Sequence, residues 1–464
     1  MISFWEVMDR ACNKGPLMSA NEFDMKLFKV TMEAQKRFGI VYDPKHPVPS
    51  DDDLADRLFE AGIYLYKEVG TYCIDTERVI RFSEDEIRDS IKSLTMLPST
   101  IDIGEGTEKR VLFKRGISDP RKPLCIGGVV EGNPREGRDF VQIYKSVAQE
   151  PIIDGIYYGP APESIEGRKW NIGSPLEVHA ARNAVGWLRE ATRSVGRPGL
   201  HLLDASPSAV GTISACYPEN GLRKSDAVAL ATIGELKVNY ELLNKVAYTM
   251  EYGCYCMPYW TAVIGGFAGG PEGAAIVSVA CALNAILVYR VGGAGYVEPS
   301  SILHDPPINT YRQTVWVRNA SMQALTRNTN LILGGGGLTC AGPGTEMQLW
   351  EIAVLGLHIS AGGGHIAAGC RKAKLTKPNQ GTGMEPRWEG ENARAAASLS
   401  RDEVNELVNF AFTKYEDQLH VDKAPQGFSF EELYNPETVE IRPHYLEIYH
   451  KVKSEMEQHG LRYD

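Results

Sequence analysis

The feature that most constrains the fold is a regular alternation of short apolar runs with longer helical patterns, which begins near Lys122. The apolar runs end in a glycine or a polar residue and have the length of buried strands. Alternating strands and helices favour a parallel sheet, and eight such units favour a closed α/β barrel of the (β/α)8 TIM type at residues 122–370. The predicted strands are 124–130, 152–158, 200–204, 236–240, 254–259, 293–297, 330–333 and 365–369.

Helical patterns separate these runs, most clearly over residues 175–194, 271–289, 311–326 and 345–360. The fourth unit is the weakest, because 227–233 has the pattern of a short helix before the short strand 236–240. Residues 1–121 are predicted to form an N-terminal helical extension without strands, in which Ser83 and Glu86 form a capping box. Residues 371–464 are predicted to form a C-terminal helical extension packed on the barrel.

Composition argues against two classes of partner. The chain has 464 residues, with 49 Lys and Arg against 59 Asp and Glu, and a formal net charge of −10. Its longest basic run is the fragment 371–374, so we expect no binding to nucleic acid. No uncharged apolar stretch approaches the ~20 residues of a membrane span. The N-terminal segment carries Glu6 and Asp9 and does not resemble a signal peptide, so we expect a cytoplasmic protein without membrane contact.

The nine cysteines are scattered along the chain without a Cys-x-x-Cys pair, which is typical of reduced thiols in a reducing compartment. Cys254 and Cys256 are the only close pair, and no histidine lies near them at the spacing of a metal ligand. We therefore expect buried structural cysteines and no metal site.

In a (β/α)8 barrel the reacting groups lie at the carboxyl ends of the strands, and this position defines the candidates. Asp204 is the catalytic candidate, and the substrate-binding candidates are Ser206, Tyr259, Trp260, Glu298 and Gly336. Aromatic rings such as Tyr259 and Trp260 could hold a methylated ammonium group by cation–π attraction. Packing in the core, with one ring exposed, is the alternative for these two residues.

The face of the third strand decides the role of Asp204. Leu200, Leu202 and Asp204 share one face, and His201 and Leu203 share the other. If Leu200 and Leu202 fill the barrel, Asp204 reaches its mouth and His201 points at a helix. The alternative for Asp204 is a cap for the turn that follows.

Three glycine-rich runs, 265–270, 334–337 and 362–364, lack the dinucleotide-binding pattern. They suit close approach of the backbone to a large flat ligand, or they only mark loops. His365 opens the last predicted strand, at the end of the barrel that usually serves stability, so we expect a structural role for it.

Several motifs, in the same order and over nearly the whole chain, resemble those of monomethylamine:corrinoid protein methyltransferases. They are 58–62 (LFEAG), 70–76 (GTYCIDT), 83–87 (SEDEI), 174–178 (SPLEV), 196–199 (GRPG), 265–270 (GGFAGG), 340–347 (CAGPGTEM) and 381–385 (GTGME). The resemblance implies a TIM barrel that forms homo-oligomers, docks a separate corrinoid protein over its mouth and passes a methyl group to Co(I).

The resemblance fails where that family does its chemistry. Its members carry pyrrolysine after the third strand, whereas the matching segment here, Leu202-Leu203, is about two residues shorter and has no electrophile. The acidic residue just beyond is retained as Asp204. A second family carboxylate falls on Tyr259, and the family glutamine falls close to Gly336. Monomethylamine is therefore not the expected substrate.

Our leading interpretation is a corrinoid-dependent methyltransferase that moves a methyl group from a methylated amine, with a quaternary amine favoured, to the Co(I) of a partner protein. The corrinoid (cobamide) comes with that partner, and no tightly bound cofactor is expected. A catalytically silent barrel that binds a ligand or a corrinoid protein is the main alternative. An enzyme with a wholly different reaction is a third.

Overall fold

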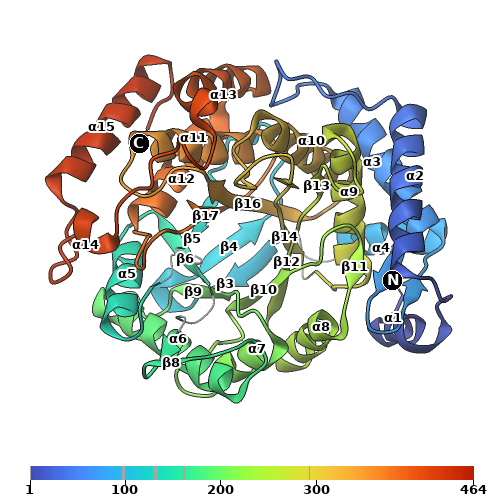
Figure 1. Ribbon diagram of the computed structural model, residues 1–464, viewed down its shortest axis with the longest axis horizontal. Helices are drawn as coiled ribbons and strands as arrows, with labels where there is room; N and C mark the ends of the chain where they lie inside the picture. Colours follow the sequence, from blue (N-terminus) through green and yellow to red (C-terminus); the bar gives the residue numbers. More distant parts are fainter. Residues whose placement is uncertain are drawn as a thin grey trace.

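The computed structural model describes residues 2–96, 100–128, 134–159, 162, 164–291 and 293–463. Eight parallel strands close into a barrel in the order β10-β12-β14-β16-β17-β5-β6-β9, which confirms the predicted fold class (Figure 1). Their bounds are β5 (Leu124–Gly127), β6 (Ile153–Tyr158), β9 (His201–Asp204), β10 (Ala227–Ala231), β12 (Tyr255–Trp260), β14 (Ala294–Val297), β16 (Ile332–Thr339) and β17 (Ile366–Lys372). Residues 129 and 130 of the first predicted strand lie outside the described residues.

The prediction for the fourth strand was wrong. The barrel strand is β10, which was expected to be helical, whereas Lys237–Val238 (β11) pairs with β1 (Thr71–Cys73) outside the barrel. Helix α8 (Tyr240–Tyr252) begins where the predicted strand ends. The alanine-rich run of β10 has high helix propensity, but its pairing with β9 on one edge and β12 on the other overrides that local preference.

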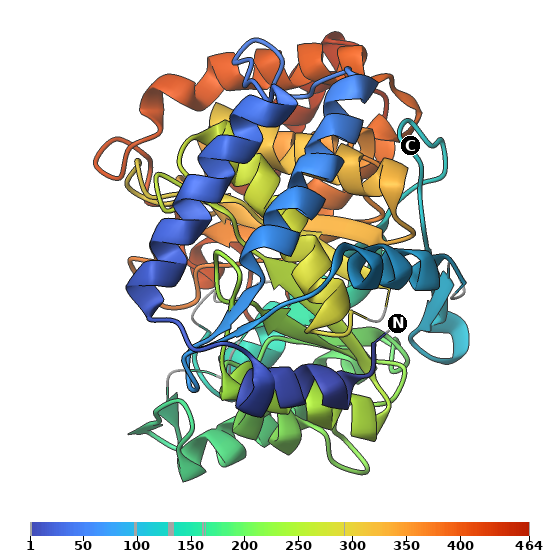
Figure 2. The same cartoon turned by 90° about the vertical axis from the view of Figure 1, so that its right-hand side faces the viewer.

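Helices surround the barrel, and four of them match the clearest helical patterns of the sequence. The surrounding helices are α5 (Arg138–Ala148), α6 (Pro175–Ser194), α7 (Ala209–Ala215), α8, α9 (Pro271–Leu287), α10 (Arg312–Asn328), α11 (Glu346–Ala361) and α12 (Met384–Ala395). Nearly every residue of α9 and α11 is buried, because helices from the two ends of the chain cover them. Figure 2 shows α2 (Ala20–Phe38) and α3 (Asp52–Val69) beside α9, and α13 (Arg401–Tyr415) and α15 (Pro443–Gln458) pack on α11.

The N-terminal region is not purely helical, which corrects the prediction of a helical extension without strands at residues 1–121. It contains two antiparallel pairs, β1 with β2 (Arg78–Ile80) and β3 (Thr100–Ile103) with β4 (Arg110–Phe113). The predicted capping box is confirmed, since the Ser83 amide donates to Glu86 at 2.9 Å and the Glu86 amide donates to the Ser83 hydroxyl at 3.1 Å. It opens α4 (Glu84–Met96).

The remaining elements are short. They are α1 (Phe4–Asp9), η1 (Arg10–Lys14), η2 (Gly106–Glu108), β7 (Ser164–Ile165), β8 (Arg168–Lys169), β13 (Val263–Ile264), β15 (Ser300–Ser301), η3 (Ala396–Ser398), η4 (Glu416–Gln418) and α14 (Phe430–Leu433). Among the described helices, none combines the length and the apolar character that a bilayer crossing requires.

The β3–β4 hairpin closes the amino-terminal end of the barrel, which we call the base. In Figure 1 it lies across the centre of the ring of strands. Ile101, Ile103 and Leu112 of the hairpin belong to the same apolar cluster as the inward-facing residues of the barrel, which include Leu203 and Met257. The hairpin therefore continues the barrel core downward and fills this end of the barrel.

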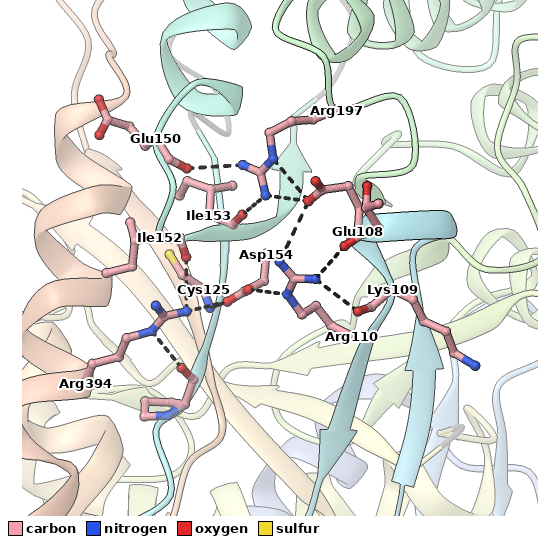
Figure 3. Close-up of polar contacts among 12 residues, drawn as sticks. Glu108, Lys109, Arg110, Cys125, Glu150, Ile152, Ile153, Asp154, Arg197 and Arg394 are labelled. Carbon is pink, nitrogen blue, oxygen red and sulfur yellow. Dashed lines mark hydrogen bonds and ion pairs between the residues drawn. The ribbon is translucent and has the colours of Figure 1, made fainter.

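Partly buried ion pairs fasten this hairpin to the barrel (Figure 3). The Asp154 carboxylate on β6 accepts hydrogen bonds from Arg110 of the hairpin at 2.9 Å, from Arg394 of α12 at 2.7 Å and from the Cys125 amide at 3.0 Å. Beside it, Arg197 donates to Glu108 at 2.6 Å and to the Ile153 carbonyl at 2.6 Å. One buried carboxylate thus joins three segments that are distant in the sequence.

Candidate active site at the barrel mouth

A cavity of about 240 Å³ opens at the carboxyl ends of the barrel strands, which we call the mouth. Its walls come from six barrel strands (β5, β6, β12, β14, β16 and β17) or from the segments after them, at the place where barrel enzymes bind substrates. The lining residues are Gly128, Tyr157, Tyr259, Thr261, Glu298, Ser300, Asn309, Gly337, Leu338, Gly369, Cys370 and Arg371. Two of the six sequence candidates, Tyr259 and Glu298, are among them.

Two tyrosines contribute aromatic surface to this cavity. Tyr157 on β6 and Tyr259 on β12 stand three strands apart around the barrel. The Tyr157 ring stacks on Tyr296, with ring centroids 6.1 Å apart and an interplanar angle of 12°. Tyr296 is fully buried in the barrel core, where its hydroxyl lies 3.8 Å from the Met257 sulfur. The Tyr157 ring is therefore supported from below, which favours a fixed cavity floor.

Polar bonds hold the rim of the cavity in place. The Asn309 side chain accepts a hydrogen bond from the Leu338 amide at 2.6 Å and donates to the Pro299 carbonyl, so it joins the loop after β14 to β16. Next to it, the buried Glu351 carboxyl accepts from the amides of Cys340 at 2.7 Å and Ala341 at 2.9 Å. Burial raises the pKa of Glu351 to about 7, against the lowering effect of these hydrogen bonds.

A buried polar cluster of Arg318, His358 and Glu389 backs the mouth from the helix side. Arg318 Nη1 donates to His358 Nε2 at 3.4 Å, and His358 Nδ1 donates to the Val354 carbonyl at 2.6 Å. Burial lowers the pKa of Arg318 to about 10, while the charges of Glu298 and Glu389 act in the opposite direction. The cluster is thus coupled electrostatically to Glu298 in the cavity wall.

Glu389, on α12, is the carboxyl of this cluster, and its pKa is strongly perturbed. Burial raises its pKa to about 8, and the Arg318 charge and the Gly369 amide oppose that rise. Gly369 lines the cavity with φ at 85°, and a Cβ there would lie 2.7 Å from the Gly128 amide nitrogen. The strand must therefore carry glycine at this point, where its backbone turns between the cavity and Glu389.

The predicted orientation of Asp204 was wrong. Leu203 belongs to the cluster that fills the barrel, whereas Leu200 and Leu202 belong to the cluster between the strands and the surrounding helices. Asp204 therefore faces the helices. Its carboxylate accepts from the Ser206 hydroxyl at 2.8 Å and from Thr212 of α7 at 3.2 Å.

A buried lysine adds a counter-charge beneath the same loop. The Lys245 ammonium of α8 donates to the Ser206 carbonyl at 2.6 Å. Burial lowers the pKa of Lys245, and the charge of Asp204 partly restores it. Asp204, Ser206 and Lys245 together fix the loop after β9, so the sequence candidate Ser206 is occupied in holding Asp204.

The side chain of Trp260 and the residue Gly336 do not line the cavity. Trp260 is fully buried in the outer cluster, because it follows the inward-facing Tyr259 and so points toward the helices. Gly336 packs on its neighbouring strand, since a Cβ there would lie 2.1 Å from the Gly369 carbonyl oxygen. His201 shares the inward face with Leu203, contrary to expectation, and its Nδ1 lies 2.9 Å from the Ser225 carbonyl.

Two further features of the sequence, His365 and the glycine run 362–364, lie at the base of the barrel. The His365 ring packs at a tilt of 42° against Phe113 of the hairpin with ring centroids 3.9 Å apart, a position that agrees with its structural interpretation. A Cβ on Gly363 would lie 2.5 Å from a side-chain carbon of Thr326. In the run 362–364, close approach is thus between parts of this chain rather than to a flat ligand.

Sequence reasoning missed most of the cavity lining, including Tyr157, Thr261, Asn309 and Arg371. A signal was present for two of them, because Tyr157 and Arg371 lie near the carboxyl ends of strands β6 and β17. Asn309 carries no such signal, since it belongs to a loop whose path only the tertiary structure defines.

Known proteins resemble this chain over nearly its full length. The family model for monomethylamine methyltransferase MtmB matches residues 2–461. Monomethylamine methyltransferase MtmB2 of Methanosarcina acetivorans is 31% identical, with 98% of each chain covered, and MtmB of Methanosarcina mazei is 30% identical with the same coverage. The crystal structure of the Methanosarcina barkeri enzyme superposes with a TM-score of 0.93 at 30% identity, covering 99% of this chain and 98% of that one. The chain therefore belongs to the monomethylamine methyltransferase MtmB family of methylamine:corrinoid methyltransferases.

Proposed function

We propose that this protein transfers a methyl group from a tertiary or quaternary methylated amine to the Co(I) of a separate corrinoid protein. The family supports the reaction class, because its members methylate a partner corrinoid protein. The observation that carries the choice of donor is the lining of the mouth cavity, in which Tyr157, Tyr259 and Glu298 face one volume. Aromatic faces and a carboxylate together suit a methylated ammonium cation.

The chemistry of the leaving group favours a highly substituted nitrogen. In the transfer, the N–CH3 bond breaks, the methyl group passes to the two-electron nucleophile Co(I), and the bonding pair stays on nitrogen. A quaternary ammonium therefore leaves as a neutral amine without any proton transfer. A tertiary amine leaves in the same way once its nitrogen is protonated, and the role that we propose for the cavity residue Glu298 is to accept a hydrogen bond from that N–H group.

We further propose that monomethylamine is not a substrate of this chain, in contrast to what the names of its relatives state. The segment Leu202-Leu203 offers no electrophile that could form an adduct with a small amine. Leu203 lies in the apolar barrel core, and Asp204 is buried under α7. The proposed donor is instead activated by its own positive charge.

The test measures methyl transfer to a corrinoid protein reduced to Co(I), and the absorbance change of the corrinoid on methylation reports the transfer. The donors are monomethylamine and a panel of tertiary and quaternary methylamines with and without acidic groups. We expect turnover with at least one member of the panel and none with monomethylamine. Turnover with monomethylamine would refute the donor assignment, and binding of a donor without any transfer would favour the silent barrel.

A further inference from the structure

The mouth cavity contains one cationic side chain that the proposed function does not use. Arg371 lines the cavity at the end of β17, whereas Glu298 lines it directly after β14. Strand β16 separates β14 from β17, so the two opposite charges belong to different parts of the wall. Arg371 also begins the basic fragment 371–374, which the sequence analysis identified as the longest basic run of the chain.

The backbone that carries Arg371 is fixed on both sides. Arg371 pairs in register with Leu338 of β16, and its carbonyl accepts a hydrogen bond from the Thr339 hydroxyl at 3.3 Å. The next residue, Lys372, is buried and donates to Gln426 of the C-terminal segment at 2.5 Å. The backbone that carries the Arg371 side chain is therefore fixed on a barrel strand, which suits a recognition group.

A ligand with only a positive charge would use one side of this wall. An ammonium bound near Tyr259 and Glu298 would gain no attraction from the Arg371 guanidinium, which has the same sign of charge. An arginine presents five N–H donors in a planar fork that matches the two oxygens of a carboxylate, and it can hold more than one partner.

The size of the cavity leaves room for a second group. Its volume is about 240 Å³, whereas roughly 10–15 Å³ on the same measure is enough for one water molecule. A methylated nitrogen between the tyrosines would not fill such a space, so the donor can carry a further group that extends toward β17.

We infer that the ligand of this cavity is a zwitterion, with a methylated ammonium group on the Tyr259 and Glu298 side and a carboxylate bound by Arg371. The identity of the ammonium end rests on the proposed function, and the acidic end rests on Arg371. The inferred substrate class is N-methylated amino acids of small size, in place of simple methylamines.

Calorimetric binding to the full-length protein, with three matched pairs of compounds, tests this inference. N-methylglycine, N,N-dimethylglycine and N,N,N-trimethylglycine are each compared with the analogue in which an ethyl group replaces the carboxymethyl group. The pairs keep the number of N-methyl groups constant and change only the carboxylate. For at least one pair we expect the carboxylate member to bind tenfold or more tightly to the unsubstituted protein.

Two variants separate Arg371 from general charge effects. Arg371→Gln should reduce the preference for the carboxylate member to within about threefold, since the loss of a tenfold preference corresponds to roughly 1.4 kcal/mol. Lys374→Gln removes the same charge from the same basic run at an exposed position and should keep the full preference. Both variants should melt within a few degrees of the unsubstituted protein.

Each outcome decides one of the two proposals. Equal or tighter binding of the ethyl compounds, binding of no compound, or a preference that survives Arg371→Gln would overturn the zwitterion inference. Methyl transfer to Co(I) from the ethyl compounds alone would support the proposed function and refute the inference. Arg371-dependent binding of the carboxylate compounds without transfer from any donor would support the inference and refute the proposed function.

Discussion

The charged groups at the two ends of the barrel differ in their surroundings. At the base, the Asp154 carboxylate is matched by Arg110, Arg394 and a backbone amide, and the apolar side chains of the β3–β4 hairpin fill the end of the barrel. At the mouth, the charged groups Glu298 and Arg371 face a cavity, and behind them burial raises the pKa of the Glu389 carboxyl to about 8.

This difference separates stability from function along one axis. A carboxylate with its full set of donors contributes to stability and has no remaining capacity for a ligand. Charged groups that line a cavity are also within reach of a ligand, whatever partners they have in the fold. We therefore expect substitutions at the base to change stability and substitutions at the mouth to change binding.

The largest effect is expected for Asp154→Ala. It removes the carboxylate that pairs with Arg110 and Arg394. Breaking a fully buried pair costs about 3–5 kcal/mol, and because these arginine side chains are 32% and 25% exposed, we expect a loss at the lower end, about 3 kcal/mol. Chemical denaturation should show the loss, with ligand affinity of the folded protein unchanged. Asp102→Asn is the matched control on the same hairpin, since Asp102 and its partner Lys109 are more than half exposed and the pair should contribute less than about 1 kcal/mol. Equal costs for the two variants would contradict this assignment.

The second effect concerns pH. The folded-state pKa of Glu389, about 8, is above its ordinary value of 4.5. The unfolded chain therefore releases this proton first, and the contribution of Glu389 to stability falls as the pH rises from about 4.5 to about 8. In Glu389→Gln this component is absent, so the variant should gain stability relative to the unsubstituted protein by up to a few kcal/mol at pH 9 and little at pH 5. Parallel profiles of melting temperature against pH would show that Glu389 is not the titrating group.

Asp204→Asn is expected to change stability rather than binding, as substitutions at the base of the barrel do, although Asp204 ends a barrel strand. The change weakens two charge-assisted hydrogen bonds and removes the charge opposite the buried Lys245. A loss of about 1.5–3 kcal/mol in unfolding free energy follows. Affinity for a cationic ligand should stay within about threefold. An unchanged melting temperature together with lost affinity would return Asp204 to the functional role that the sequence suggested.

The smallest free-energy change, and the most specific one, is expected for Glu298→Gln. Binding of a methylated ammonium compound should weaken by tenfold or more, about 1.4 kcal/mol, because the carboxylate that complements the cation is lost. The melting temperature should change by only a few degrees. Glu251→Gln, at an exposed position of α8, removes the same charge far from the cavity lining and should leave binding unaltered. Equal affinity in both variants would remove Glu298 from the site.

The sequence by itself determined the barrel class, the number of strands and most helix positions. The alternation of apolar runs and amphipathic patterns can be recognised in a single sequence, because strand and helix periodicities are local properties. Local signals also placed the capping box at Ser83 and the start of α6 at Pro175, where proline occupies the first helical turn. The family motifs in the sequence indicated the same barrel fold.

Only the tertiary structure decided which side chains reach the site. The third strand is apolar on both faces, so its pattern could not show that Leu203 rather than Leu202 enters the barrel, and the role of Asp204 depended on that choice. The alanine-rich β10 became a strand because both its edges are paired. The cavity brings together Tyr157, Glu298 and Arg371, which are far apart in the chain and meet only because the barrel closes.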